Sequence, residues 1–141
     1  MRKIAFFDID GTLTSEIDGS IPASTVDAIR AARANGNLMF INTGRCFHNL
    51  EERFQSIGFD GFVCGCGTDI YCDGRQLIHT APPHEVTMQL LEKAKEVDMD
   101  ILFESFDSTV FDLSRPLHNP DARKLYKEKA KKGFEVFDPW T

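Results

Sequence analysis

The chain lacks three features that would each place it in a particular class: a long apolar segment, an excess of basic residues, and a metal-type spacing of cysteine or histidine. No apolar run approaches the roughly 18 residues of a membrane-spanning helix. The first residues, Met1-Arg2-Lys3, lead into a strand-like run rather than a signal peptide. The net charge of −6 argues against nucleic acid, whose binding surfaces are broadly basic. We therefore expect no membrane and no nucleic-acid partner, and a cytoplasmic location.

The cysteines and histidines form no recognisable metal or disulfide pattern. Cys64-Gly65-Cys66 lacks the C-x-x-C spacing of zinc sites, and in a chain of this size with no export signal the four cysteines are expected to be free thiols. The 141 residues, 42% hydrophobic and 27% charged, have the composition and length of an ordinary soluble domain. This composition argues against a disordered or fibrous protein.

Two carboxylates directly follow the first apolar run. Ile4–Phe7 is continuously apolar rather than alternating, which predicts a strand covered on both faces of a parallel sheet. Ligands of open parallel sheets bind beyond the carboxyl ends of the strands, where Asp8 and Asp10 fall. There Asp8 can attack phosphorus and form an aspartyl-phosphate, while Asp10 can protonate the leaving oxygen and later activate water. Gly11 permits a tight turn whose exposed amides can face phosphate oxygens.

The two acids also invite Mg²⁺, which prefers oxygen ligands and often binds through one or two carboxylates plus a substrate phosphate. Three other interpretations compete for them. A solvated acidic turn is the simplest. An EF-hand loop fails by spacing, because Thr12, Leu13 and Gly19 stand where an acid or amide, a glycine and a glutamate are needed. A receiver-type phospho-acceptor would lie on a later strand, behind an acidic cluster at the end of the first.

A strand, helix, strand unit follows. Ala23–Asn35 places apolar residues on one helical face and precedes Gly36, which suits the end of a helix, and Leu38–Ile41 is a second apolar run. Such a crossover makes the two strands parallel, so that Thr43 lies at the same sheet edge as Asp8. Its hydroxyl can then hydrogen-bond a phosphate oxygen near the amides that begin the next helix. The alternative is a plain N-cap threonine for a helix with apolar positions Phe47, Leu50, Phe54 and Ile57.

These segments resemble two motifs of a known enzyme family. Asp8-Ile9-Asp10-Gly11-Thr12-Leu13 is similar to motif one of the haloacid dehalogenase (HAD) superfamily of phosphatases, and Phe40-Ile41-Asn42-Thr43-Gly44-Arg45 resembles the Thr-Gly-Arg form of motif two. That form is typical of the Cof-like and sugar-phosphate phosphatase branch, whose large cap follows motif two. The resemblance implies an α/β fold with a Rossmann-like parallel sheet core.

The resemblance also implies roles for the motif residues. It makes Asp8 the nucleophile and Asp10 the general acid/base. The residues expected to bind the substrate are Gly11, Thr43, Gly44 and Arg45. It implies Mg²⁺ held by the Asp8 carboxylate, the Asp10 backbone carbonyl and a further acidic residue. The family pattern has two later motifs, a lysine in motif three and an acidic residue in motif four. Neither can be assigned in this chain, so only the N-terminal half of the family pattern is present. In addition, Cys66-Gly67-Thr68 replaces the Asn-Gly-Ala that the family commonly has before a hairpin.

Ala81-Pro82-Pro83 is the predicted domain boundary, because consecutive prolines make a stiff joint. Residues 1–80 are expected to form the N-terminal part of a HAD-like core, with a third strand at Gly61–Cys64 and a hairpin that turns at Asp73-Gly74. Residues 81–141 are expected to begin an α/β cap. The elements predicted for this cap are a helix over His84–Val97, strands over Ile101–Phe106 and Thr109–Leu113, and a helix over Pro120–Gly133.

Side-chain positions are also predicted for the two helices of the second domain. The expected inward residues of the first are Val86, Leu90, Leu91, Ala94 and Val97. The second helix carries the basic residues Arg123, Lys124, Lys127, Lys129, Lys131 and Lys132. For this run, a solvated helix face balanced by Asp121 and Glu128 is favoured over a site for an anionic ligand.

The sequence therefore predicts a Mg²⁺-dependent phosphatase that acts on a small phosphorylated metabolite, such as a sugar phosphate, through an aspartyl-phosphate. Two alternatives stay open: an incomplete module that binds a phosphorylated ligand or a protein, and a phosphotransferase or phosphomutase on the same scaffold. Loss of one charge-stabilising group can cost on the order of a thousandfold in rate. We therefore expect a longer chain, a second copy or another chain to complete the core.

Overall fold

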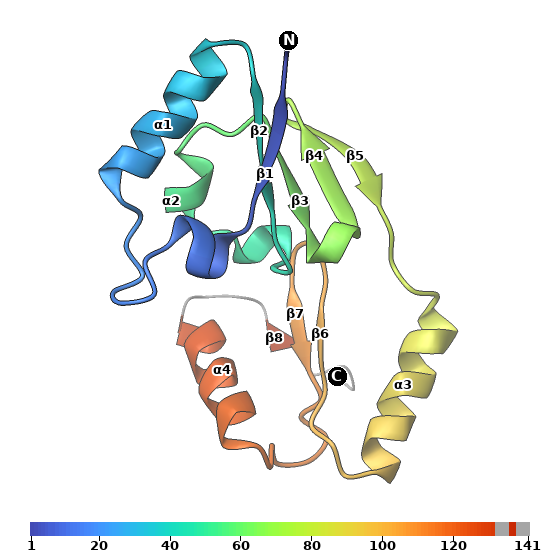
Figure 1. The fold of residues 1–141 in the computed structure, drawn as a ribbon. Helices are drawn as coiled ribbons and strands as arrows, with labels where there is room; N and C mark the ends of the chain where they lie inside the picture. The colour runs from blue at the N-terminus through green and yellow to red at the C-terminus, as the bar shows by residue number, and fades with distance from the viewer. Residues whose placement is uncertain (132–135, 138–141) are drawn as a thin grey trace. The chain divides into compact units, whose positions relative to one another are not determined.

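The computed structural model describes residues 1–131 and 136–137, and the chain forms two compact units, Met1–Thr80 and Ala81–Thr141 (Figure 1). Each unit combines a β-sheet with helices, which agrees with the predicted α/β class. Within the described ranges, no helix has both the length and the apolar character needed to cross a membrane.

The first unit is built on a five-stranded sheet in the order β1-β2-β3-β4-β5. β1 pairs with β2 and β2 with β3 in parallel, whereas β3, β4 and β5 are joined antiparallel. The parallel pairing confirms the predicted crossover unit. At the hairpin, Asp73 and Gly74 have φ angles of 50° and 72°, the left-handed pair that a two-residue turn favours. The strands span Ile4–Phe7, Leu38–Asn42, Gly61–Cys64, Asp69–Cys72 and Arg75–His79.

The crossover helix α1 spans Ala23–Ala34 and confirms the helix predicted there. Gly36 follows it with a φ of 83°, a left-handed conformation that glycine adopts without steric cost. The N-cap position is Pro22, so no side chain caps the first turn.

The prediction of a single helix after Thr43 is wrong. The segment instead forms a 3₁₀ turn η2 (Phe47–Asn49) and a one-turn helix α2 (Glu52–Gln55). Between them Leu50 and Glu51 have extended backbone, with ψ angles of 110° and 145°. The break lets the predicted apolar residues reach the core without a continuous helix, because Leu50, Phe54 and Ile57 are all buried.

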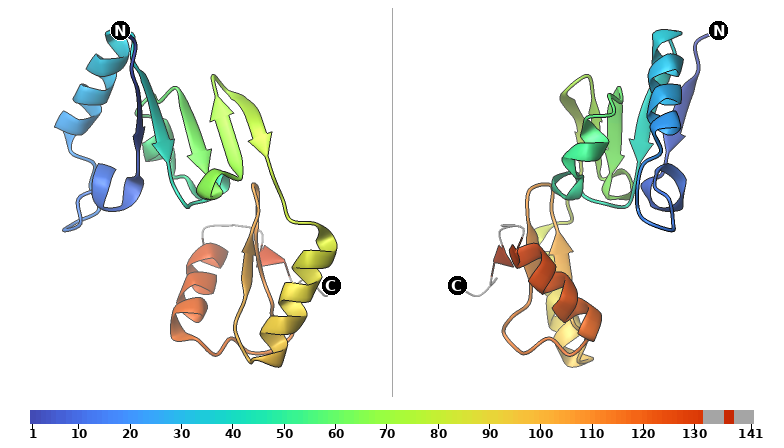
Figure 2. Two further views of the ribbon diagram at one scale, coloured as in Figure 1. Left: turned by 45° about the vertical axis from the view of Figure 1, so that its right-hand side comes forward. Right: turned by 90° about the vertical axis from the view of Figure 1, so that its left-hand side faces the viewer.

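The core of the first unit lies on one face of the sheet, where α1 and α2 pack (Figure 2). Ile29 of α1 and Phe54 of α2 join Met39 and Ile41 of β2 in one cluster. The buried members of this cluster are Ile9, Leu13, Ile29, Met39, Ile41, Leu50, Phe54, Ile57, Phe59 and Cys64. Burial of Cys64 agrees with a packing role, and it raises the pKa of this thiol to about 12.

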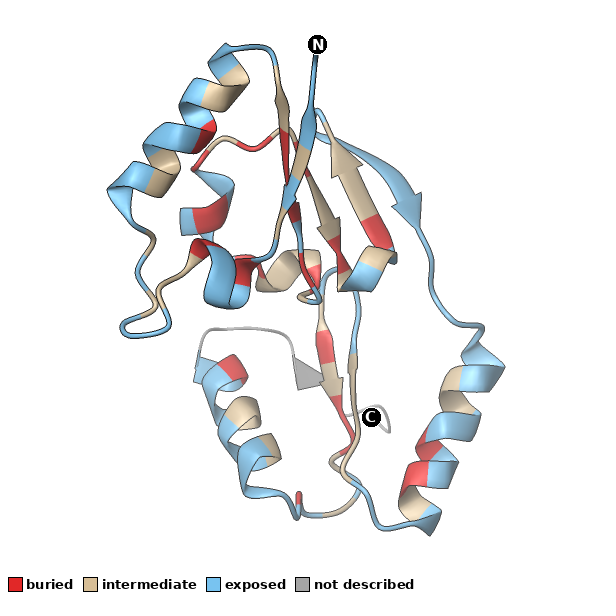
Figure 3. Ribbon diagram, in the orientation of Figure 1, coloured by how far each residue is buried: buried red, intermediate tan, exposed pale blue. Residues whose placement is uncertain are grey.

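On the opposite face of the sheet β1 is uncovered, so the prediction that β1 is covered on both faces is wrong. Ile4 and Phe6 are each 57% exposed, and Figure 3 shows β1 mostly exposed or intermediate. The physical reason is that both helices pack against the face of Ala5 and Phe7. Strand pairing places a set of apolar residues together on the other side, here called the open face: Ile4, Phe6, Leu38, Phe40, Val63, Ile70 and Ile78. No described strand pairs with the second edge of β1.

Gly61 on β3 is required by a close approach rather than by its backbone angles. A Cβ atom there would lie 2.2 Å from the Tyr71 carbonyl oxygen and 2.5 Å from Cε1 of Phe40. We expect Gly61→Ala to lower the free energy of unfolding of the first unit by about 1–3 kcal/mol, because backbone and a packed ring must shift. Chemical denaturation measures this. Gly44→Ala is the matched control, since its Cβ would meet only the Cys66 sulfur at 3.5 Å, and equal losses in both variants would contradict the steric account.

Asp60 ties β2 to α1 in the loop before β3. Its Oδ2 accepts a hydrogen bond from the Met39 amide at 2.8 Å, and its Oδ1 accepts one from Nη2 of Arg33 at 2.8 Å. The Arg33 hydrogen bond lowers the pKa of Asp60, with burial acting in the opposite direction. The same bond raises the pKa of Arg33.

This shift makes the stability of the first unit depend on pH in a defined direction. A carboxyl whose folded pKa is depressed contributes stability above its unfolded pKa of about 3.9, and this stability is lost as the pH falls through the lower folded value. We expect Asp60→Asn to cost about 1–2 kcal/mol at neutral pH, a reduced figure because the Arg33 side chain is 37% exposed. The variant should also lose less stability than the parent on acidification. Denaturation at neutral and acidic pH tests this against Asp27→Asn, an exposed carboxylate of α1 that should behave like the parent.

The second unit contains a three-stranded sheet in the order β6-β7-β8, antiparallel between β6 and β7 and parallel between β7 and β8. The strands are Leu102–Glu104, Thr109–Phe111 and Val136–Phe137. The helices are α3 (His84–Glu96) and α4 (Pro120–Lys131). These elements confirm the two helices and the first two strands predicted from the sequence. Lys132 and Gly133 of the predicted second helix lie outside the described residues.

The predicted inward stripe of α3 is only partly correct. Leu91 and Ala94 are buried, but Val86, Leu90 and Val97 are 42%, 51% and 55% exposed. Around the helix axis the two buried residues lie on one side of the apolar stripe and the three exposed residues on the other, so only one side of the stripe is buried.

Candidate active site

The turn after β1 presents Asp8 and Asp10 through an alternation of buried and exposed side chains. Ile9 and Leu13 are 0% and 1% exposed and anchor the turn η1 (Ile9–Leu13) in the core. Asp8, Asp10 and Gly11 are therefore left on the outside. Gly11 has a φ of 72°, and a Cβ atom there would lie 3.0 Å from Oε1 of Glu16. Glycine at this position thus serves the turn itself.

Thr43 lies at the adjacent strand end. Asp8 directly follows the end of β1 at Phe7, and Thr43 directly follows the end of the parallel neighbour β2 at Asn42, so both lie at the carboxyl edge of the sheet. The Thr43 amide donates to the Val63 carbonyl at 2.9 Å, which continues the strand by one residue. Its Oγ1 accepts a hydrogen bond from the Arg45 amide at 3.2 Å, and among the described residues its hydroxyl proton has no acceptor. Thr43 is buried and its Oγ1 accepts this bond, so the hydroxyl oxygen is held in a fixed place.

An ion pair joins the two motifs across 35 residues of sequence. Nε and Nη2 of Arg45 donate to the two carboxylate oxygens of Asp10 at 3.2 and 2.7 Å. A third nitrogen, Nη1, lies 3.5 Å from Oε1 of Glu51, and the guanidinium stands 5.6 Å from the ring centre of Phe54. The two-pronged geometry is specific to arginine. The sequence predicts Arg45 as a substrate-binding residue but does not predict Asp10, Glu51 and Phe54 as its partners, because no local pattern points to them.

The loop after β3 packs against motif two. The Gly65 amide donates to the Arg45 carbonyl at 2.9 Å and the Cys66 amide to the Thr43 carbonyl at 3.3 Å. Cys66 has a φ of 57° and is exposed. Its sulfur would lie 3.5 Å from a Cβ atom at position 44, which is an ordinary van der Waals contact.

The oxygen donors at this site suit part of a magnesium site. The Asp8 carboxylate is exposed and caps no backbone amide. The Asp10 carboxylate is engaged by Arg45, so a ligand role for this residue would fall to its backbone carbonyl. In residues 1–131, no group of three or more histidine, cysteine or acidic side chains could hold a metal. Mg²⁺ often binds through only one or two carboxylates and retains several waters, so these donors are compatible with it.

A family model identifies the family of the chain. The model for haloacid dehalogenase-like hydrolases matches residues 5–139, almost the whole chain. The chain is a member of the haloacid dehalogenase-like hydrolase family. This confirms the resemblance carried by the segments Asp8–Leu13 and Phe40–Arg45.

Individual HAD relatives agree with this membership. "Putative phosphatase YkrA" of Bacillus subtilis is 26% identical over 106 residues, which are 75% of this chain and 41% of that protein. A hypothetical protein from Geobacillus kaustophilus has 28% identity and a TM-score of 0.76, over 98% of this chain and 52% of that structure. The HAD subclass IIB sugar phosphatase BT4131 has 27% identity and a TM-score of 0.70, over 91% of this chain and 48% of that structure. This HAD chain thus spans about half the length of these relatives.

Proposed function

We propose that this chain supplies the nucleophile half of a phosphatase site that hydrolyses a small phosphate ester through an aspartyl-phosphate. The observation that carries the proposal is the joining of the two motifs at one sheet edge. Asp8 and Thr43 follow adjacent parallel strands, and the Asp10–Arg45 pair links the same two segments. This arrangement supports a site in which Asp8 is the nucleophile, Asp10 the proton carrier, and Thr43 and Arg45 donors to the phosphate.

The chemistry follows from the residues of the chain. A carboxylate oxygen of Asp8 forms a bond to phosphorus as the bond to the leaving oxygen breaks, and Asp10 gives that oxygen a proton. Asp10 then takes a proton from the water that attacks the phosphorus, and the bond to Asp8 breaks to release phosphate. Mg²⁺ held by the Asp8 carboxylate and the Asp10 carbonyl would offset the phosphate charge. The Thr43 hydroxyl donates to a phosphoryl oxygen throughout.

Arg45 has a second part in this proposal. Because it engages both oxygens of Asp10, proton transfer by Asp10 requires this pair to open. A guanidinium released from a carboxylate has the geometry to bind phosphate. We infer that substrate binding draws Arg45 from Asp10 toward the phosphoryl group. Gly44 and the Gly11 amide would lie beside it. The pair thereby holds the acid in place while the site is empty.

The second unit and the open face belong to the same proposal. Residues 81–141 fit the start of a cap domain that covers the site and selects the substrate. A sugar phosphate is the substrate class we favour, because BT4131 is named a sugar phosphatase.

The open face and the unpaired edge of β1 fit contact with further polypeptide, which relatives of twice the length contain. A longer form, a second copy or another chain would supply this polypeptide.

Thr43 provides a direct test of phosphate binding. We expect Thr43→Val to reduce kcat/KM for p-nitrophenyl phosphate on the order of a hundredfold, since it removes one donor from the transferring group. Thr43→Ser is the matched control, because it keeps the hydroxyl and should retain most activity. Equal activity of the valine and serine variants would contradict the assignment. The assay uses both residues 1–141 and a form extended to the length of the relatives, with and without Mg²⁺.

The same preparations separate the alternatives. A module that only binds would gain thermal stability from inorganic phosphate and show no turnover in either form. A phosphotransferase or phosphomutase would pass the phosphoryl group to an added sugar phosphate rather than to water. Phosphate release to water in the extended form is the result that the proposal predicts.

A further inference from the structure

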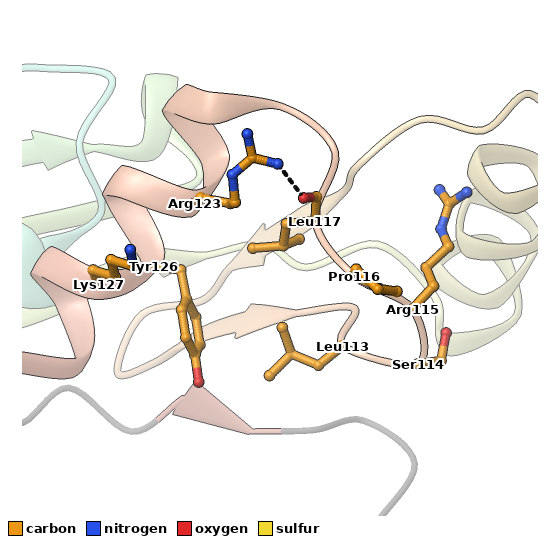
Figure 4. A pocket seen from close by; sticks show the side chains of 8 residues that line it. All are labelled: Leu113, Ser114, Arg115, Pro116, Leu117, Arg123, Tyr126 and Lys127. Carbon is orange, nitrogen blue, oxygen red and sulfur yellow. Dashed lines mark hydrogen bonds between the residues drawn. The ribbon is translucent and has the colours of Figure 1, made fainter.

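A hollow lies within the second unit, between α4 and the loop that follows β7 (Figure 4). Its volume is about 480 Å³, within the range of small-molecule sites. The apolar part of the lining comes from Leu113, Pro116, Leu117 and the ring of Tyr126. That ring packs edge-on against Phe111 with centroids 5.3 Å apart, so this wall is fixed by the core of the unit.

Basic side chains line the same hollow, and none of its lining residues in the described part of the chain is a carboxylate. Arg115 is committed elsewhere, because it donates to the Asp98 carboxylate and, at 2.6 Å, to the Met99 carbonyl. Arg123 donates through Nη1 to the carbonyls of Leu117 and His118 at 2.7 and 2.8 Å. These bonds fix the guanidinium against the loop and leave its Nε and Nη2 without a partner among the described residues.

Lys127 stands one helical turn after Arg123 on the same side of α4. It forms no hydrogen bond or ion pair with any residue in the described part of the chain. The two residues also line a neighbouring hollow together with Lys124 and Lys131, where Glu128 is the one acid. In a chain of net charge −6, this places local positive charge directly beside an apolar hollow. By contrast Lys129, of the same helix, is buried with Nζ 3.5 Å from Oε1 of Glu104.

We propose that this hollow binds a small organic anion, with its carboxylate or phosphate on Arg123 and Lys127 and its apolar body against Leu117 and Tyr126. A purely solvated helix face accounts for the exposed cations but not for an adjoining apolar cavity whose lining, among the described residues, holds no acid. The unused guanidinium nitrogens and the unpaired ammonium supply donors for the charged group. This site is independent of the phosphatase proposal, since it shares no residue with motif one or motif two.

The test uses three probes on the uniformly ¹⁵N-labelled chain. 4-Phenylbutanoate combines an apolar body with a carboxylate, 4-phenylbutan-1-ol keeps the body without the charge, and acetate keeps the charge without the body. We expect saturable amide shifts at Leu117, Arg123 and Tyr126 with the acid, and binding about tenfold weaker or absent with the alcohol and acetate. Equal affinity for acid and alcohol, shifts confined to the open face of the first unit, or no saturable binding would each overturn the proposal.

Variants locate the charge contribution. Arg123→Gln combined with Lys127→Gln should weaken binding of 4-phenylbutanoate about tenfold or more. Lys93→Gln combined with Lys95→Gln removes the same charge from α3 and should leave it unchanged. Because Arg123 also supports the loop, Lys127→Glu serves as a second variant that disturbs no contact in the described structure. Unchanged affinity in Lys127→Glu, with the fold intact by circular dichroism, would contradict the site.

Discussion

Asp8→Asn is expected to abolish phosphate ester hydrolysis by the extended form, with a loss of roughly 10⁴-fold or more in kcat, because an amide cannot form the acyl phosphate. The loss should be chemical rather than structural. Asp8 is exposed and its side chain caps no backbone amide, so the free energy of unfolding of the variant should differ from that of the parent by no more than about 0.5 kcal/mol. Steady-state assays with p-nitrophenyl phosphate and a denaturation curve measure the two effects.

Asp27→Asn is the matched control for this substitution. It makes the same chemical change at an exposed position on α1, away from the strand ends, and should leave both activity and stability at the parent level. Substantial hydrolysis by Asp8→Asn would remove the nucleophile assignment. A large fall in stability would instead show that Asp8 has structural contacts that the fold described here does not contain.

Phe54→Ala is expected to have the largest effect on stability. The side chain is fully buried in the core cluster, and such a truncation leaves a cavity that costs about 3–5 kcal/mol. Its ring also lies 4.6 Å from the guanidinium of Arg53 and 5.6 Å from that of Arg45, so the site above it should loosen as well. Urea denaturation monitored by circular dichroism measures the loss.

Phe6→Ala makes the same change on the open face. Phe6 is 57% exposed and contacts the ring of Phe40 at a centroid distance of 5.4 Å, so its truncation should cost about 1 kcal/mol or less. The comparison tests the one-sided core of the first unit. Losses of similar size at Phe54 and Phe6 would show that the open face is covered in solution.

Local patterns in the sequence predicted the elements that depend on local physics. The apolar runs became β1 and β2, the residues between them became α1, and Asp73-Gly74 became the hairpin turn. Each of these depends on side-chain periodicity or on a backbone angle that few residues adopt. The motif residues also reach the strand ends where a parallel crossover must place them.

Contacts between distant residues could not be predicted in this way. The helix expected after Thr43 is broken at Leu50 and Glu51, where the backbone is extended. The apolar spacing did not predict this break, since Leu50 and Phe54 are buried without a continuous helix. The bond between Asp10 and Arg45 joins residues far apart in sequence and has no periodic signal. The exposure of Ile4 and Phe6 likewise depends on which face α1 and α2 cover, which an apolar run cannot specify.

The central claim, that Asp8 carries the phosphoryl group, is tested most directly by trapping the intermediate. Borohydride added during turnover of p-nitrophenyl phosphate reduces an acyl phosphate to an alcohol, which would convert Asp8 into homoserine. Mass spectrometry of the peptide that contains residues 4–13 reads out this change. The account predicts homoserine at position 8, dependent on the phosphate ester. Turnover with an unmodified Asp8, or with reduction at a different carboxylate, would contradict it.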